Sequence, residues 1–429
     1  MLPALRTFAR ILARHWPALI AWYVGGEVLH RLLVQLAGFV GGYSTLGGLL
    51  LLPLAVGARL AAYVAMYLTV RPSLVHVAQS GEPDAGIRAF LRSTLVAILP
   101  FSIFYAAWGM LDADQKEFFR LASSIAFRET GFGLGEAIVD RGGLISVGVL
   151  PVTVLVVALL VRALQARFRE RLPEWTLTLA AYAELLWTFM LFTLVGQWLA
   201  GVRAWFSGRA GALWLQDFGD GVAAAIPSLA SVWEAVLWLV GIVIAAAIVP
   251  AAWLAVAGVI YGADFDALPP VLARRTEALR GAVGSLARTL LQRFEDLWAA
   301  VAAIWRGGPL LFGAFALAYA LWALAERTGT RGVLQVIGGH ESGFWSAWLP
   351  LVTVGVAAIA EPIRVAIVAT AFDAVVGRPE AGIGVRDSVA DGESDGLVAD
   401  GDIEPERPLG VVRQQEDGED AVGIGPLPA

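Results

Sequence analysis

Residues 32–58, LLVQLAGFVGGYSTLGGLLLLPLAVGA, contain no charged side chain. About 20 apolar residues are enough for a helix to cross a hydrocarbon core of about 30 Å. The middle of the stretch is GGYSTLGG (41–48), and four glycines beside two hydroxyl residues are typical of a tight turn. We therefore predict that this turn joins two membrane-spanning helices. The alternative is a single span with Arg31 and Arg59 at its two ends.

The composition extends this interpretation to most of the chain. Of 429 residues, 58% are hydrophobic and 16% are charged, whereas soluble domains are nearer a quarter charged. The apolar runs are apolar on every face, which excludes the alternating pattern of a membrane β-barrel. We predict an all-α integral membrane protein with eight transmembrane helices, at about 16–40, 47–70, 93–111, 143–162, 178–201, 241–262, 308–325 and 344–366.

Residue types that are rare or missing narrow the chemistry. Lys116 is the only lysine, and the chain has no asparagine and no cysteine. Such a skew is typical of a high-GC genome and predicts a prokaryotic source. Without cysteine there is no disulfide, no thiolate nucleophile and no cysteine metal site. The four histidines, His15, His30, His76 and His340, are scattered singly, so we expect neither a metal site nor another cofactor.

Arginines predict the orientation in the membrane. Arg6, Arg10 and Arg14 form one basic stripe on the first helix, which is typical of a helix that lies against anionic headgroups. Sixteen arginines fall on segments that are cytoplasmic if the N-terminus is inside, against eight basic residues on the outer segments. The positive-inside rule then places both termini in the cytoplasm of a cell-membrane protein. Dispersed basic residues favour membrane lipids as partners and argue against nucleic acid.

Four prolines recur with a period close to 99 residues. Pro53, Pro151, Pro250 and Pro350 are 98, 99 and 100 residues apart, and each follows an apolar residue in an even-numbered predicted span. This period predicts four duplicated helical hairpins, since transporters are often built from internal repeats. Loop lengths that compensate one another are the alternative, and the sequence leaves both open.

Two segments outside the spans have a character of their own. Between 279 and 304 apolar residues recur every three or four positions, which predicts a cytoplasmic amphipathic helix at about 268–306 within a transmembrane domain of residues 1–375. Residues 376–429 hold thirteen acids against four arginines, without apolar periodicity, and are predicted to be a disordered acidic cytoplasmic tail. Either segment is a candidate docking site for a protein partner, and the oligomeric state is not predicted.

One charge cluster interrupts the first predicted span. Glu27, His30 and Arg31 share one helix face, and Arg59 lies at a similar depth on the other side of the turn at Ser44. A charge near the middle of a span costs about 2.5–3.5 kcal/mol, so such groups normally face the bundle interior and are paired. The cluster is predicted to be either part of a transport pathway or a structural ion pair, and both interpretations stay open.

Other polar residues are weaker candidates. Glu184, Glu361 and Arg364 adjoin long uncharged runs, so we expect them near the inner interface with structural roles. The motif DAD (112–114) has two acids but no supporting ligands nearby in the sequence. No catalytic set emerges, so we do not expect an enzyme. The sequence predicts a transporter or channel-like protein that uses the cluster, or alternatively a non-enzymatic membrane scaffold or accessory subunit.

Overall fold

The computed structural model describes residues 2–79, 86–130, 149–168, 173, 176–209, 214, 227–261, 263–265, 308–378 and 383–385. Its elements are α1 (Leu2–Tyr43), α2 (Thr45–Val70), the 3₁₀ turn η1 (Arg71–Ser73), α3 (Val75–Gln79), α4 (Ile87–Ala107), α5 (Met110–Thr130), α7 (Val149–Arg167), α8 (Thr176–Ser207), α10 (Pro227–Ile260), β1 (Ala263–Phe265), α13 (Pro309–Ile337), α14 (Ser342–Val376) and β2 (Ile383–Val385).

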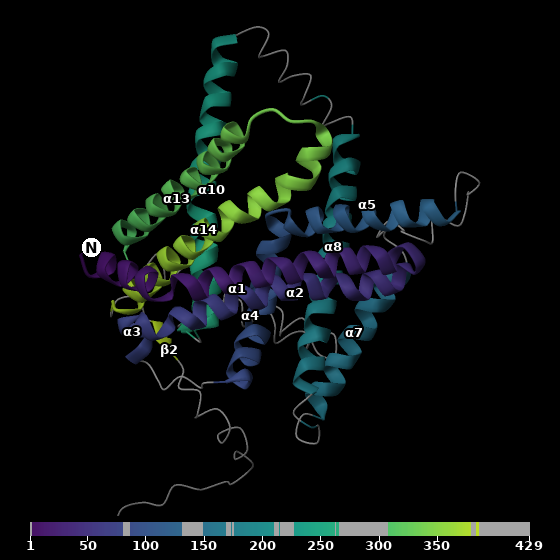
Figure 1. Ribbon diagram of the computed structural model, residues 1–429, viewed down its shortest axis with the longest axis horizontal. Coiled ribbons are helices and arrows are strands. Elements are labelled where there is room, and N and C mark those ends of the chain that lie inside the picture. The colour runs from purple at the N-terminus through teal and green to yellow at the C-terminus, as the bar shows by residue number, and fades with distance from the viewer. Residues whose placement is uncertain are drawn as a thin grey trace, which may run out of the picture. The chain divides into compact units, whose positions relative to one another are not determined.

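The predicted turn between the first two helices is confirmed. Helix α1 ends at Tyr43 and α2 begins at Thr45, with Ser44 as the single residue between them. Ser44 is extended (φ −149°), and its hydroxyl accepts a hydrogen bond from Gly47 N at 3.3 Å, as an N-cap residue does. The two helices therefore lie side by side as a hairpin (Figure 1). The alternative of one straight span through residues 32–58 is wrong.

Small residues bring α1 and α2 into close contact. A Cβ atom built on Gly26 would lie 2.2 Å from Ala62 Cβ, and one on Gly48 would lie 2.8 Å from Gly41 Cα. Small residues let two helix backbones approach in this way, and association inside a bilayer depends on such packing. The close contact also sets the register between the helices, which fixes the height of Glu27 relative to Arg59.

This contact predicts different effects for two neighbouring glycines. Both Gly25→Ala and Gly26→Ala gain about 1 kcal/mol of helix propensity. A Cβ at Gly25 meets nothing within 4 Å, so Gly25→Ala should be neutral or slightly stabilising. At Gly26 the added methyl overpacks the interface, and we expect a net loss of about 1–3 kcal/mol. The free energy of unfolding in mixed micelles checks this difference, and equal effects of the two variants would contradict the close contact.

Among the described residues, five helical segments are long and apolar enough to cross a membrane: Thr45–Ser73, Phe90–Ala107, Thr178–Ser207, Leu310–Ile337 and Ser342–Val376. They are compatible with a membrane protein. The described residues contain two shorter apolar helical segments, Leu150–Gln165 and Ile248–Ile260. Eight spans are therefore not confirmed.

Three predicted spans are not among these five segments, and each absence has a local reason. The span predicted at 16–40 lies in α1, where Glu27, His30 and Arg31 break the apolar run. The span predicted at 143–162 begins outside the described residues and continues in α7. In the span predicted at 241–262, the described apolar helical segment is only Ile248–Ile260, the last part of α10. Orientation and cellular location stay predictions.

The four hairpin repeats are not confirmed either. Four successive hairpins would pair α4 with α7 and α8 with α10. In the structure α7 packs on α8, and α4 packs on α8 and α10, whereas α13 and α14 do pack against each other. The four periodic prolines do not occupy equivalent places. Pro151 is the third residue of α7, while Pro53, Pro250 and Pro350 lie inside α2, α10 and α14.

Helix α2 is the most enclosed of the candidate spans. Of its apolar window 61% is buried, against 17–44% for the other four. It packs on α1, α4, α8, α10 and α14, and its side chains Leu52, Leu60, Val64 and Met66 are inaccessible to solvent. A charged side chain on α2 is therefore held among helices on several sides, and Arg59 is such a side chain.

The described residues include two short strands, β1 after α10 and β2 after α14. β1 and β2 pair antiparallel, with Ala263 opposite Val385. β2 falls inside 376–429, and its residues 383–385 pair with β1. The disorder of the acidic tail stays a prediction. The predicted amphipathic helix at 268–306 and the rest of the acidic tail lie outside the described residues.

Candidate functional site

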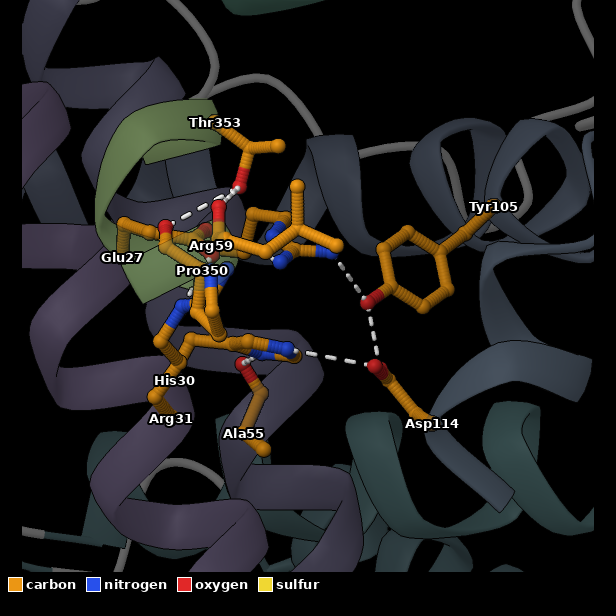
Figure 2. Close-up of polar contacts among 10 residues, drawn as sticks. Glu27, His30, Arg31, Ala55, Arg59, Tyr105, Asp114, Pro350 and Thr353 are labelled. Carbon is orange, nitrogen blue, oxygen red and sulfur yellow. Dashed lines mark hydrogen bonds and ion pairs between the residues drawn. The ribbon is translucent and has the colours of Figure 1, made fainter. Parts of the chain in front are cut away.

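Six polar side chains from four helices meet beside the α1–α2 hairpin (Figure 2). Helix α1 contributes three of them, and α2, α4 and α5 contribute one each; they are Glu27, His30, Arg31, Arg59, Tyr105 and Asp114. We call this set the polar network. Figure 2 shows Tyr105 and Asp114 on the opposite side of the group from Glu27 and Arg31, with Arg59 and His30 reaching across to them.

Glu27 is the centre of one half of the network. Its Oε1 atom accepts a hydrogen bond from Arg31 Nε, and its Oε2 atom accepts one from Arg59 Nη2, both at 2.9 Å. The Glu27 side chain is 8% exposed, that of Arg59 is 21% exposed, and that of Arg31 is 47% exposed. The structure thus brings Glu27 together with Arg31 on its own helix and with Arg59, which the sequence placed at a similar depth across the turn, and Arg59 is more enclosed than Arg31.

The other half of the network comes from α4 and α5. Arg59 Nη1 donates to the Tyr105 hydroxyl at 2.8 Å, and that hydroxyl donates to Asp114 Oδ2. His30 Nε2 lies 3.2 Å from Asp114 Oδ1, and His30 Nδ1 lies 2.8 Å from the carbonyl oxygen of Ala55. A continuous series of contacts therefore runs from Arg31 through Glu27, Arg59, Tyr105 and Asp114 to His30.

Asp114 reaches the network because the chain reverses after α4. Gly109 has a φ of +72°, a left-handed conformation that glycine adopts without strain, and α5 then returns beside α1 (Figure 1). The buried face of α5 is formed by Leu111, Phe118, Ala122 and Ala126, and Asp114 lies on this face. In the sequence DAD has two acids without supporting ligands, and nothing there predicted that Asp114 would join the polar network.

A cavity of about 200 Å³ adjoins the polar network. It is lined by Glu27, His30, Arg31, Val34, Gln35, Arg59, Asp114 and Glu117. Arg31 and Gln35 are exposed, whereas Glu27 and His30 are buried, so the cavity connects the protein surface with the network. Glu117 accepts two hydrogen bonds from Arg120, which lower its pKa, so it is ionised at neutral pH.

Glu184, a weaker candidate, is buried in helix packing. Arg162 Nε lies 2.6 Å from Glu184 Oε2, and the Arg162 guanidinium stands 5.5 Å from the centre of the Trp187 ring. The pair joins α7 to α8, where a carboxylate without a counter-charge would be costly. The expected structural role remains the simplest account of Glu184, because its partners are the residues that hold these two helices together.

Glu361 and Arg364 form a second buried pair, one helical turn apart on α14. Arg364 Nη2 is 2.5 Å from Glu361 Oε2, yet among the described residues Arg364 Nε and Nη2 make no hydrogen bond of good geometry. The guanidinium carbon lies 3.8 Å from the ring centre of Trp253, 5.0 Å from that of Tyr63 and 5.5 Å from that of Trp322. Both residues are buried, and the Arg364 guanidinium lies among aromatic rings.

Comparisons with known proteins do not identify the site, which is therefore interpreted from its own geometry. No family model, no curated protein and no solved structure matches this chain. In the part of the chain that the structure describes, no group of three or more histidine, aspartate and glutamate side chains is placed to hold a metal ion. What the polar network offers is buried charge, a hydrogen-bonded phenol, an imidazole and an adjoining cavity.

Proposed function

We propose that this chain is a membrane protein of the transporter or channel type, which moves protons or small monovalent cations past the polar network. The observation that carries the proposal is the cavity of about 200 Å³ that joins the protein surface to buried Glu27 and Asp114. Ionisable side chains in the interior of a helical membrane bundle typically mark ion pathways or proton relays. Carboxylates along such a pathway attract cations and repel anions.

A purely structural ion pair is the competing interpretation, and it accounts for less. Such a pair needs only Glu27 and Arg59, in contact and enclosed. It gives no reason for the additional buried groups His30 and Asp114, or for the open space beside them. Protein interiors are close-packed, and voids larger than a water molecule are few. A cavity lined by charged groups therefore favours a pathway.

Flux measurements on liposomes test the proposal without changing the polar network. Gln35 is exposed and lines the cavity, so Gln35→Trp should fill the cavity and reduce the flux of H⁺, Na⁺ or K⁺ at least tenfold. Leu36→Trp is the matched control, because Leu36 is the next residue on α1, is exposed, and does not line the cavity. The readout is an internal dye that reports pH or the cation, under an imposed gradient.

Two results would contradict the proposal. One is wild-type protein that moves none of these ions faster than protein-free liposomes do. The other is equal flux through Gln35→Trp and Leu36→Trp. The scaffold alternative depended on residues 268–306 and 376–429, and it stays a prediction because the described residues include only 376–378 and 383–385 of these.

A further inference from the structure

The hydrogen-bond partners of His30 fix the position of one ring proton. His30 Nδ1 lies 2.8 Å from the backbone carbonyl oxygen of Ala55. A carbonyl oxygen can only accept a hydrogen bond, so Nδ1 must carry the proton. A neutral imidazole has one N–H group, and its other nitrogen is then an acceptor. In neutral His30 the atom Nε2, which faces Asp114, would therefore have a lone pair and no proton.

Asp114 cannot satisfy that lone pair when it is ionised. Its Oδ1 atom is 3.2 Å from His30 Nε2, and its Oδ2 atom accepts the proton of the Tyr105 hydroxyl. That phenol proton is committed to Asp114, because Arg59 donates to the phenol oxygen from the other side. Two acceptors would thus face each other across the His30–Asp114 contact. One additional proton, on Nε2 or on Oδ1, turns this contact into a hydrogen bond.

We propose that His30 and Asp114 together form a proton-binding site, which holds one exchangeable proton between Nε2 and Oδ1. Both side chains are buried, at 4% and 11% exposed, and the 3.2 Å between Nε2 and Oδ1 leaves no room for a water molecule to supply the missing donor between them. The proton comes from water through the adjoining cavity and returns to it. The role of this site in ion movement rests on the proposed function. The presence of the proton is a separate property that can be measured independently.

The surrounding charges are compatible with binding of this proton. The ionisable groups that face the pair are Glu27 and Arg31 on α1, Arg59 on α2, Tyr105 on α4 and Glu117 on α5. The cavity lining holds three carboxylates and two guanidinium groups, and the Arg120 guanidinium pairs with Glu117 from outside the lining. Tyr105 joins the two parts of the network, since it accepts from Arg59 and donates to Asp114.

Nitrogen-15 NMR of the full chain in bilayers, with labelled histidine, tests the site. The His30 signal is identified by its loss in His30→Asn. At neutral pH we expect either an imidazolium, with both ring nitrogens protonated, or an Nδ1–H imidazole beside a protonated Asp114 carboxyl. The second state shows a carboxylic acid carbonyl band in the infrared spectrum, and that band disappears in Asp114→Asn.

Two variants sharpen this test. In Asp114→Asn the side-chain amide can donate to Nε2, so His30 should be a neutral Nδ1–H imidazole at neutral pH. Asp112→Asn is the matched control, because Asp112 is exposed on α5 and pairs with Lys116, and the His30 spectrum should not change. The spectrum of wild-type protein at neutral pH decides. A neutral His30 with its proton on Nε2, and no protonated Asp114 carboxyl, would overturn the proton site.

The two proposals can fail separately. Wild-type protein that has the shared proton but moves no H⁺, Na⁺ or K⁺ contradicts the proposed function and supports the proton site. Protein that moves cations while His30 carries its proton on Nε2 supports the proposed function and overturns the proton site.

Discussion

Glu27→Gln should lower the free energy of unfolding by about 3 kcal/mol, because breaking a buried ion pair leaves one charge without compensation. The glutamine oxygen can still accept from one guanidinium, but its amide group then faces the other, which has only donors. Arg59 suffers most, since its side chain is 21% exposed and cannot turn into solvent as readily as Arg31, at 47%. Unfolding in mixed micelles measures the loss.

The same measurement separates the contributions of the two arginines. The double variant Glu27→Gln with Arg59→Met should cost about 1–3 kcal/mol less than the sum of its single variants, since the partners are in direct contact. Glu27→Gln with Arg31→Met is the matched comparison. Arg31 is half exposed and four residues away on the same helix, a type of pair with a coupling of about 0.3–0.5 kcal/mol. Strict additivity for Glu27 and Arg59 would contradict the contact across the hairpin.

The second large effect is expected at Arg364. Arg364→Met leaves Glu361 buried among aromatic rings without its counter-charge, and we expect a loss of about 3–5 kcal/mol. Glu361→Gln should cost about 1–2 kcal/mol less. The arginine that remains is still 3.8 Å from the centre of the Trp253 ring and close to two more rings, and a desolvated cation on an aromatic face gains about 2 kcal/mol.

Which of these two variants loses more free energy of unfolding is the test of the aromatic contacts. The double variant Glu361→Gln with Arg364→Met removes both charges and should recover most of the loss of Arg364→Met, because replacing a whole buried pair is often nearly neutral. Free energies of unfolding of the three variants are compared under one set of conditions. If Glu361→Gln proved at least as destabilising as Arg364→Met, the rings would not be holding the guanidinium.

The part of the fold that the sequence predicted best is local. GGYSTLGG contains the turn itself, and helical spacing from Ser44 was enough to match the depths of Glu27 and Arg59. The count of spans was less reliable because it relied on apolar runs. The same charges that form the site, Glu27 and Arg31, make α1 too polar to meet a length-and-hydropathy criterion. Charged side chains inside a predicted span weaken the hydropathy signal by which spans are recognised.

The second half of the site depended on a chain reversal that the apolar pattern does not reveal. The span predicted at 93–111 runs straight through Gly109, whereas in the structure α4 ends at Ala107 and α5 begins at Met110. Asp114 is brought to His30, far away in sequence, only by this reversal. One signal was present: Asp114 lies on the same stripe of α5 as Leu111 and Phe118, and an acid on an apolar stripe needs a partner.

The central claim is that the polar network has a role in ion movement and is more than a structural pair. The most direct test is flux of H⁺, Na⁺ and K⁺ into liposomes containing the double variant Glu27→Gln with Arg59→Met, compared with wild-type protein. We expect this variant to fold with most of the stability of wild-type protein and yet to lose at least nine-tenths of the flux. A double variant with both wild-type stability and wild-type flux would contradict it, because Glu27 and Arg59 would then serve only to hold the hairpin together.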